Sequence, residues 1–219
     1  MWAQVGEILP LAVGIAISPI PIIATLLMLM APKARAASLG FAGGWIAGIT
    51  VAVTVFTLLS SLLPSGDDRG QSTLVGVIKL LLGAGLLFLA LRQWRSRPAP
   101  GEEPKLPGWM AAVDTMGVGK AAGLAFLLAG VNPKNLLLGA AAGVSIGQGE
   151  SQVVPIVVFV LLAASSVVVP VLAYLVATER MTPPLQSLRA WLVQNNATVM
   201  AVLLLVLGTV VIGKALAAW

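Results

Sequence analysis

The sequence predicts an all-α integral membrane protein, and its composition, its apolar runs and its prolines are the observations that predict it. Of the 219 residues, 58% are hydrophobic and only 10% are charged, and the mean hydropathy is +1.00. A soluble domain carries about 25% charged residues, so this chain lacks the polar side chains to cover a water-soluble surface. It has no cysteine and no histidine, which excludes disulfides and metal sites built from these ligands, and we expect no cofactor.

Six apolar runs predict six transmembrane helices, because a helix that crosses a bilayer needs about 20 mostly apolar residues. The first run is not a secretory signal peptide, since no basic residue precedes it and Glu7 lies where such a signal is positively charged. We therefore expect this run to remain in the mature protein. The runs cover residues 6–31, 38–63, 74–92, 117–147, 153–177 and 197–217.

A polar stretch rich in arginine, proline, glutamate and glycine lies near the middle of the chain. We expect residues 95–115 to form a cytoplasmic linker between a first three-helix repeat, residues 1–94, and a second repeat, residues 116–219. Because three is an odd number of spans, two equivalent repeats must enter the membrane from opposite sides. Inverted repeats of this kind recur among transporters, where the substrate site lies at mid-membrane between interrupted helices.

The segment near 182–195, inside the second repeat, is expected to form a short amphipathic helix on the bilayer surface. Thr182 can cap such a helix, with Pro183 in its first turn. The apolar side chains of the segment then share one face: Leu185, Leu188, Trp191 and Leu192.

The basic residues give the orientation of the chain. With six spans, nine of them fall on one side, and only Arg69, Lys79 and Lys214 lie at or near the other. This bias places the basic side in the cytoplasm and both termini outside. Because the charges occupy short loops, the net charge of +5 does not indicate nucleic-acid binding. The nine are Lys33, Arg35, Arg92, Arg95, Arg97, Lys105, Lys120, Arg180 and Arg189. Tryptophans near the predicted interfaces are typical membrane anchors: Trp2, Trp94, Trp109, Trp191 and Trp219.

Prolines interrupt two of the runs about halfway along. The first run holds Ser18-Pro19-Ile20-Pro21, and the fourth holds Asn132-Pro133-Lys134-Asn135. A proline removes a backbone donor and frees carbonyl groups, which a bilayer tolerates where the break packs in protein or lines a wet cavity. The alternative is that the prolines only kink the helices, with Ser18 and Asn132 repairing the hydrogen bonds. We expect a substrate-binding centre made by Ser18, Pro19, Pro21, Asn132, Pro133, Lys134 and Asn135.

Lys134 is the most informative of these residues, because an ammonium near the bilayer centre costs a few kcal/mol and is a functional candidate by default. It lies fourteen residues beyond Lys120, about 20 Å along a helix, and so is far from either interface. We expect it to hold an anionic group or to exchange a proton with one. The alternatives are that its stem snorkels or that it is uncharged when buried. Lys79 lies nearer the end of its run, and we expect it to snorkel.

Two ladders of glycines predict close helix packing. Gly40, Gly44 and Gly48 recur every four residues in the second run, and a second ladder follows in the fourth run. Small residues on one helix face let two backbones approach closely. These glycine faces can serve either helix packing inside one protomer or the interface of a homodimer, and the sequence leaves both alternatives open. The second ladder is Gly139, Gly143 and Gly147.

With its proline-bearing first and fourth helices, at Ser18-Pro19-Ile20-Pro21 and Asn132-Pro133-Lys134-Asn135, the six-span plan resembles the LysE superfamily of exporters. Within it, the likeness is greatest to the glycolipid-addressing (GAP) proteins of actinobacteria, which include the sulfolipid-1-addressing family. The resemblance implies a bacterial inner-membrane protein that helps to move a substrate outward, such as a cell-envelope glycolipid. The related thiol carriers need a cysteine in each repeat, which excludes that activity. Amino-acid exporters carry acidic residues near their broken helices, whereas every carboxylate here lies near a predicted end or in a loop.

The function expected from these observations is a carrier or flippase for an anionic or polar substrate, working by alternating access around Lys134, with membrane lipids as partners. One alternative is an accessory subunit of a larger lipid exporter that has no transport path of its own. A second is an intramembrane hydrolase with a Ser18–Lys134 pair, since a lysine can act as base for a serine nucleophile. Ser18 does not lie in a Gly-x-Ser-x-Gly context, so we expect no enzyme and no catalytic residue. A pore is the weakest option, because the sequence has no ring of charges or carbonyl filter.

Overall fold

The computed structural model describes residues 2–31, 34–62, 69–98, 108–149 and 151–216, and in these ranges it is entirely helical, without strands. The expected all-α class is therefore confirmed for the described part of the chain. Lys33, Lys105, Trp219 and most of the hydrophilic turn at 64–70 lie outside it. The helices are α1 (Trp2–Ala16), α2 (Pro19–Leu29), α3 (Ala34–Ser61), α4 (Arg69–Arg95), the 3-10 helix η1 (Gly108–Thr115), α5 (Val118–Gly130), α6 (Pro133–Gly147), α7 (Val153–Val176) and α8 (Thr178–Leu216).

The helices of the described residues are long and apolar enough for a multi-pass membrane protein. Four of them qualify as spans by themselves, namely α3, α4, α7 and α8. The pairs α1–α2 and α5–α6 qualify as two more if each bent pair counts as one span. The apolar runs of the sequence therefore match the helices, and the first and fourth runs, which carry Pro19 and Pro133, are each divided between two of them.

Each break is a bend between two helices that continue in the same general direction. The axes of α1 and α2 differ by 51°, and those of α5 and α6 by 61°. Ser18 and Asn132, which precede the prolines, have extended backbones, because a proline disfavours the helical conformation of the residue before it. Pro19 and Pro133 then occupy the first position of the next helix, where a missing N–H costs nothing.

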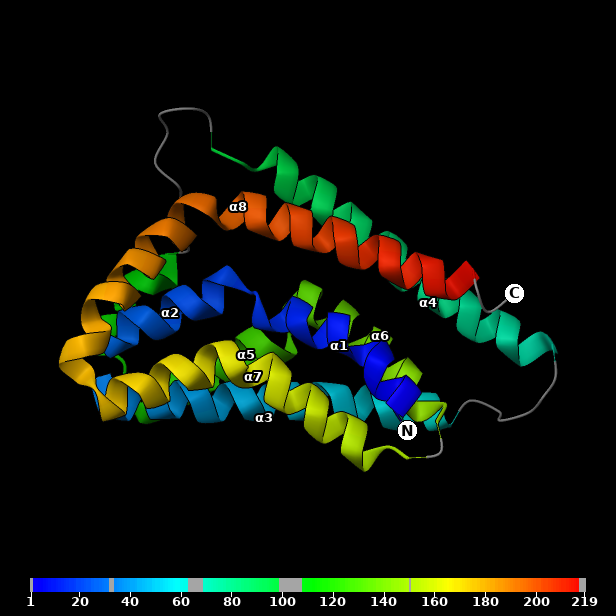
Figure 1. Cartoon of the computed structure of the whole chain (residues 1–219), viewed down its shortest axis with the longest axis horizontal. Helices are drawn as coiled ribbons and strands as arrows, with labels where there is room; N and C mark the ends of the chain where they lie inside the picture. Colours follow the sequence, from blue (N-terminus) through cyan, green and yellow to red (C-terminus); the bar gives the residue numbers. More distant parts are fainter. Residues whose placement is uncertain (1, 32–33, 63–68, 99–107, 150, 217–219) are drawn as a thin grey trace.

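One long helix replaces the separate amphipathic helix expected near 182–195. α8 has 39 residues and is about 58 Å long, well beyond the roughly 30 Å of a bilayer core. Its first part curves around one end of the molecule, drawn in orange in Figure 1. The helix continues because no glycine or proline occurs from residue 185 to residue 207. Leu185 and Leu192 are buried against the protein, whereas Leu188 and Trp191 are exposed.

The last part of the expected linker 95–115 is also structured. Residues 108–115 form η1, in which Met110 and Val113 are buried. Met110 packs in a small apolar cluster with Ile23 of α2 and Leu192 of α8. The polar stretch therefore ends in a short buried helix that contacts both halves of the chain.

The helices pair across the two halves of the sequence. α4 runs along α8, α3 along α5 and α6, and α1 along α7 and α6 (Figure 1). The start of α1 and the end of α8 lie at the same end of the molecule, and α2 ends and α3 begins at the opposite end, where α7 also meets α8 (Figure 1). This arrangement agrees with an even number of crossings.

The glycine ladders are used inside the protomer. A Cβ at Gly40 would lie 2.5 Å from the Val118 carbonyl oxygen, and one at Gly48 would lie 2.7 Å from Ala129 Cβ, so this ladder faces α5. The second ladder faces α3, where a Cβ at Gly143 would lie 2.8 Å from the Thr57 nitrogen. Both glycine ladders are therefore occupied by contacts inside the protomer, and neither is free to form the homodimer interface that the sequence left open. A further contact that the ladders do not reveal joins Gly83 of α4 to Gly208 of α8.

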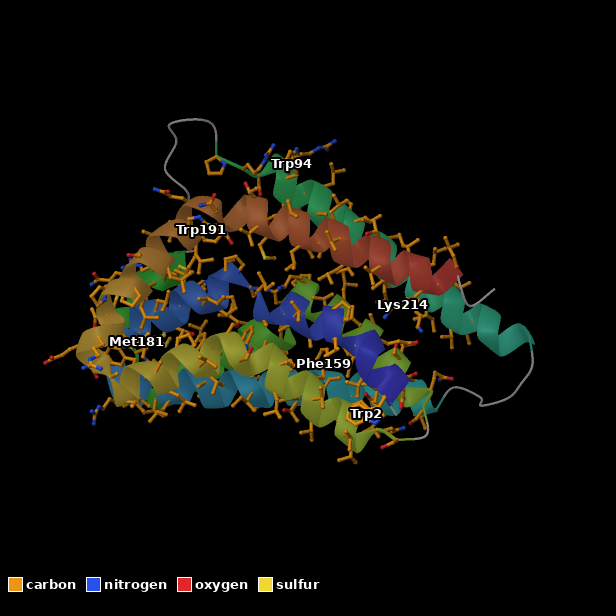
Figure 2. The ribbon with its side chains drawn as sticks, viewed as in Figure 1. Trp2, Trp94, Phe159, Met181, Trp191 and Lys214 are labelled. Carbon is orange, nitrogen blue, oxygen red and sulfur yellow. The ribbon has the colours of Figure 1, made fainter. Side chains whose placement is uncertain are left out.

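Large apolar side chains cover the outside of the bundle, as expected of a surface that contacts membrane lipids (Figure 2). Trp2 lies toward the end that holds the termini, Trp191 lies toward the other end, and Trp94 lies near the middle of the view (Figure 2). All three are exposed, as in the aromatic belts of membrane proteins. Fully buried examples of the core include Phe41, Trp45 and Phe159.

Neighbouring glycines of α3 provide a test of the α3–α5 contact. Gly44→Ala should lower the free energy of unfolding by about 1–3 kcal/mol, because its Cβ would meet the main chain of Ala122. Gly43→Ala is the matched control, since a Cβ there has no neighbour within 4 Å. Thermal unfolding in one detergent, followed by loss of the monodisperse peak, measures both. Equal midpoints would contradict the packing described.

Candidate functional site

The two helix breaks meet through the side chain of Lys134. Its Nζ donates to the main-chain oxygen of Gly14 at 2.8 Å and to Oγ of Ser18 at 2.9 Å. Gly14 lies in the last turn of α1 and Ser18 is the residue between α1 and α2, whereas Lys134 lies in the first turn of α6. The structure thus brings together the central residues of the two proline motifs.

The first turn of α6 aims Lys134 at α1. Asn132 caps this helix, because its side-chain oxygen accepts a hydrogen bond from the Lys134 N–H at 3.0 Å. Asn135 Nδ2 donates back to the Leu128 carbonyl of α5 at 3.1 Å, which ties the two halves of the broken helix together. Pro133 is exposed and starts the helix without contributing a polar group.

The prolines of the first motif explain why α1 needs a donor. In an unbroken helix the Gly14 carbonyl would accept from the Ser18 N–H, but Ser18 is extended and Lys134 takes that place. Pro19 and Pro21 are buried and have no N–H with which to extend the ladder. The last turn of α1 also carries the negative end of the helix dipole. An ammonium therefore satisfies both the free carbonyl and the local charge.

Lys134 is a buried residue, and the snorkelling alternative is wrong. Its exposed fraction is 3%, the same as that of Ser18. Bringing an ammonium out of water is expensive unless it is paired or hydrogen-bonded, and the two oxygens supply those bonds. The Asn132 side chain caps its own helix, which is the repair that the kink alternative expects of it. Ser18 instead accepts from the lysine.

The break keeps some hydrogen-bonding capacity. An ammonium has three N–H donors, and the contacts described for Lys134 use two of them. The side-chain oxygen of Asn135, which is 1% exposed, has no hydrogen-bond partner among the described residues. Unsatisfied buried polar atoms are rare in folded proteins and point to a functional or water-filled position.

The distance between Lys134 Nζ and Ser18 Oγ also suits a serine–lysine pair in which the amine takes the hydroxyl proton. Both groups are buried, so a substrate carbonyl does not reach Ser18 in this conformation. The contact is therefore best described as a link between two helix ends.

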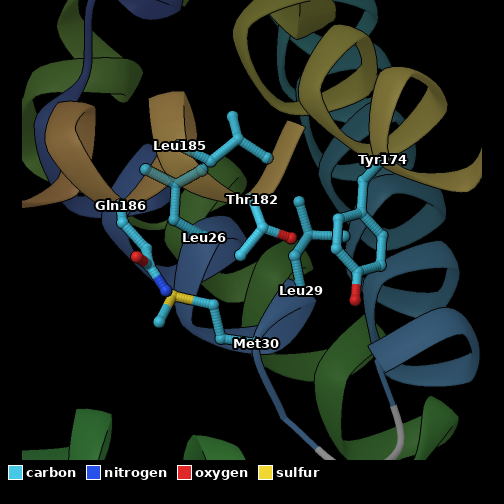
Figure 3. A pocket seen from close by; sticks show the side chains of 7 residues that line it. All are labelled: Leu26, Leu29, Met30, Tyr174, Thr182, Leu185 and Gln186. Atoms are coloured by element: carbon cyan, nitrogen blue, oxygen red, sulfur yellow. The ribbon is translucent and has the colours of Figure 1, made fainter. Parts of the chain in front are cut away.

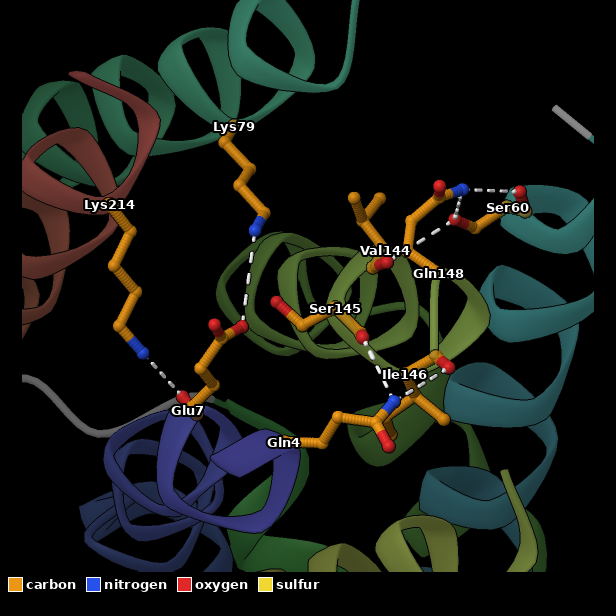
Figure 4. Close-up of polar contacts among 9 residues, drawn as sticks. All are labelled: Gln4, Glu7, Ser60, Lys79, Val144, Ser145, Ile146, Gln148 and Lys214. Atoms are coloured by element: carbon orange, nitrogen blue, oxygen red, sulfur yellow. Dashed lines mark hydrogen bonds and ion pairs between the residues drawn. The ribbon is translucent and has the colours of Figure 1, made fainter. Parts of the chain in front are cut away.

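A second polar cluster, which sequence reasoning missed, lies where α1, α4 and α8 meet (Figure 4). Lys214 Nζ donates to the main-chain oxygen of Glu7 at 2.8 Å, and Lys79 Nζ lies 4.0 Å from Glu7 Oε2. The expectation that Lys79 snorkels is wrong, because its ammonium points toward α1 and its side chain is 15% exposed. The only signal in the sequence is the presence of Glu7 inside the first run.

An apolar cleft of about 210 Å³ opens near the end of the molecule opposite the termini (Figure 3). It is smaller than the roughly 300–1,000 Å³ of sites for drug-sized ligands, so it fits only a segment of a lipid. Arg189 lies beside it, with Nη1 4.0 Å from Met30 Sδ. The lining residues are Leu26, Leu29, Met30, Tyr174, Thr182, Leu185 and Gln186.

Replacing Lys134 tests the link between the breaks. Lys134→Ala should lower the free energy of unfolding by about 1–3 kcal/mol, because it leaves the buried Gly14 oxygen without a donor. Lys120→Ala removes the same groups at an exposed position of α5. It should change the free energy of unfolding by less than about 0.5 kcal/mol. Thermal midpoints of the purified variants in one detergent compare them. A destabilisation that is no larger at Lys134 than at Lys120 would show that the link contributes nothing.

Comparison with known families gives one match, which covers nearly the whole chain. The family described as "Sap, sulfolipid-1-addressing protein" matches residues 8–217. No curated protein and no solved structure matches significantly. The match confirms the resemblance to the sulfolipid-1-addressing proteins, whereas the wider LysE superfamily stays an expectation. Because the match includes all eight α-helices in whole or in part, the chain belongs to the sulfolipid-1-addressing protein family.

Proposed function

We propose that the chain is a membrane transporter that exports or flips an anionic, lipid-linked substrate of the bacterial cell envelope, such as a sulfated glycolipid. Two repeats would alternate in access around the junction of the two breaks. The observation that carries the proposal is the buried Lys134, which joins the end of α1 to the start of α6. Interrupted helices that meet at mid-membrane are the usual setting of transporter sites.

Lys134 is suited to an anionic headgroup. A sulfate, phosphate or carboxylate oxygen could replace the Gly14 or Ser18 oxygen as its acceptor, and charge-assisted bonds are stronger than neutral ones. Ser18 and Asn135 would then offer further hydrogen bonds from the two sides of the break. Pro19, Pro21 and Pro133 would keep the break open to such exchange, while Asn132 holds the first turn of α6.

The helix pairing supports two inverted repeats. If α1, α2, α3 and α4 correspond to α5, α6, α7 and α8, then the α3–α5 pair corresponds to α7–α1. In the same way, α4–α6 corresponds to α8–α2, and α4–α8 corresponds to itself. A twofold relation between halves of opposite orientation would produce these pairs and would place residues 1–94 and 116–219 as the repeats.

Several features favour a lipid as the substrate class. The family name refers to a sulfolipid, and the apolar cleft beside Arg189 combines a wall for an acyl chain with a guanidinium for an anion. The curved first part of α8 exposes Leu188 and Trp191 at the same end of the protein, as a segment at the membrane interface would. The excess of basic residues at that end would make it cytoplasmic and the termini extracytoplasmic, in the inner membrane.

The alternative is an accessory subunit that recruits or stabilises a larger lipid exporter. The family name supports it equally, because addressing a lipid does not require a transport path. The glycine ladders do not favour it, since both are used inside the protomer.

Reconstitution of the purified protein separates the two functions. In liposomes with no other protein, it should move a fluorescent sulfated glycolipid between leaflets, measured by the fraction protected from an impermeant quencher. Lys134→Gln, which keeps a donor but removes the charge, should reduce the rate at least about tenfold. Lys120→Gln is the charge-matched control and should transport at the wild-type rate.

The outcomes separate clearly. No movement by the wild-type protein would defeat the transporter and support the accessory role. Equal rates for Lys134→Gln and the wild type would show that transport does not use the junction. Size-exclusion profiles of all variants ensure that a lost rate does not reflect a misfolded protein.

A further inference from the structure

The structure holds a second cationic site, separate from the junction of the breaks. We call it the Glu7 site, and it consists of Glu7 from α1, Lys79 from α4 and Lys214 from α8 (Figure 4). Both lysine side chains extend from neighbouring helices toward the same residue of α1 (Figure 4). Three elements that are distant in sequence thus converge on one position.

The charges of the Glu7 site do not balance. Lys79 Nζ lies 4.0 Å from a carboxylate oxygen, the limit of an ion pair, whereas Lys214 donates to the main-chain oxygen of Glu7. Among the described residues, Lys79 has Glu7 as its carboxylate within ion-pair distance, and Lys214 has none. Two ammonium groups therefore face one carboxylate, and an unpaired cation between apolar helices is costly. An anion would remove this cost.

The site is accessible to such an anion. The Glu7 side chain is 44% exposed, Lys214 is partly exposed, and the Lys79 side chain is 15% exposed. By contrast, Lys134 and Ser18 are closed off in the protein. The Glu7 site therefore has what the junction lacks in this conformation, an open approach.

The Glu7 site and the junction lie along the same face of α1. Glu7 and Gly14, whose carbonyls accept from Lys214 and Lys134, are seven residues apart. Seven residues are nearly two turns, about 10 Å along the axis. Leu207 of α8 fills the space beside Gly14, where a Cβ would meet it. The ammonium groups of Lys214 and Lys134 thus contact α1 at successive positions, and Leu207 packs beside the second contact, at Gly14.

We propose that the Glu7 site binds the anionic headgroup of a lipid, or a free anion of the same chemistry, at the end of the protein that holds the termini. The ligand is a sulfate, phosphate or carboxylate group held by Lys79 and Lys214. Glu7 acts as the internal competitor that occupies Lys79 when the ligand is absent. Binding of an anion here does not depend on transport, and only a role of the Glu7 site in export would rest on the proposed function.

Glu7 allows the site to be tested in both directions. The probe is sulfated galactosylceramide, compared with uncharged galactosylceramide, and binding to the purified protein in a neutral detergent is measured by native mass spectrometry. Lys79→Gln should weaken binding of the sulfated probe about threefold to tenfold, whereas Glu7→Gln should strengthen it by a similar factor, since it frees Lys79. Lys120→Gln should bind as the wild type does, and the uncharged lipid should respond to none of these changes.

A purely structural ion pair predicts a different result. In that case Glu7→Gln and Lys79→Gln would lower the thermal midpoint together and leave probe binding unchanged, which would overturn the proposal. Equal binding of the sulfated and uncharged lipids would overturn it too.

Competition with excess inorganic sulfate separates the two sources of the anion. Displacement of the probe, with the same dependence on Lys79 and Glu7, assigns the site to free anions. Retention of the probe assigns it to lipid headgroups, and both results support an anion site. Loss of glycolipid movement in liposomes with intact probe binding would count against the proposed transport alone.

Discussion

The hydrogen bonds of one buried ammonium hold the two helix breaks together. Proline leaves carbonyl oxygens without donors at the end of α1, and in a membrane these oxygens cannot turn to water. Lys134 supplies donors from the first turn of α6. At the other end of the same helix pair, Gln4 Nε2 of α1 donates to the Ile146 carbonyl of α6 at 3.2 Å. The antiparallel helices α1 and α6 thus satisfy each other's carboxyl ends, and the rest of the bundle is built around this pair.

The breaks were predictable from the sequence because their cause is local. A proline inside an apolar run can interrupt a helix, and Pro19 and Pro133 follow the ends of α1 and α5. Pro10 and Pro170 lie inside α1 and α7 without ending them, so the prolines indicate where a break can occur and the structure shows which ones make it. The lysine after Pro133 was equally visible as an intramembrane charge. Its partners were not, because the Gly14 oxygen becomes available only where α6 packs against α1. The role of the seven predicted residues in substrate binding stays a prediction.

Other features could not be predicted from the sequence, because they depend on the direction of a flexible side chain, on the continuation of a helix or on the packing of two helices. A lysine near the end of a run can extend toward solvent or toward the protein, and for Lys79 the position of Glu7 decides it. The polarity of residues 182–195 indicated an interfacial helix but not that it continues into α8. Gly83 and Gly208 belong to no ladder, so their contact between α4 and α8 appears only in three dimensions.

The same bonds that stabilise the junction limit how it can work. For a headgroup to bind Lys134, it must replace an oxygen that the protein already supplies, so an anion has an advantage over a neutral polar group. The free energy gained by binding the anion must also exceed the cost of separating α6 from α1, which the headgroup needs in order to enter. Glycine contacts fix α3 against α5 and α6 with little side chain between them. By contrast, side chains pack over Gly14, namely Leu207 of α8 and Leu138 of α6. In the proposed transport cycle, movement of α8 together with its partner α4 would uncover Gly14 without separating the glycine contacts of α3, and Lys79 and Lys214 lie on these two helices.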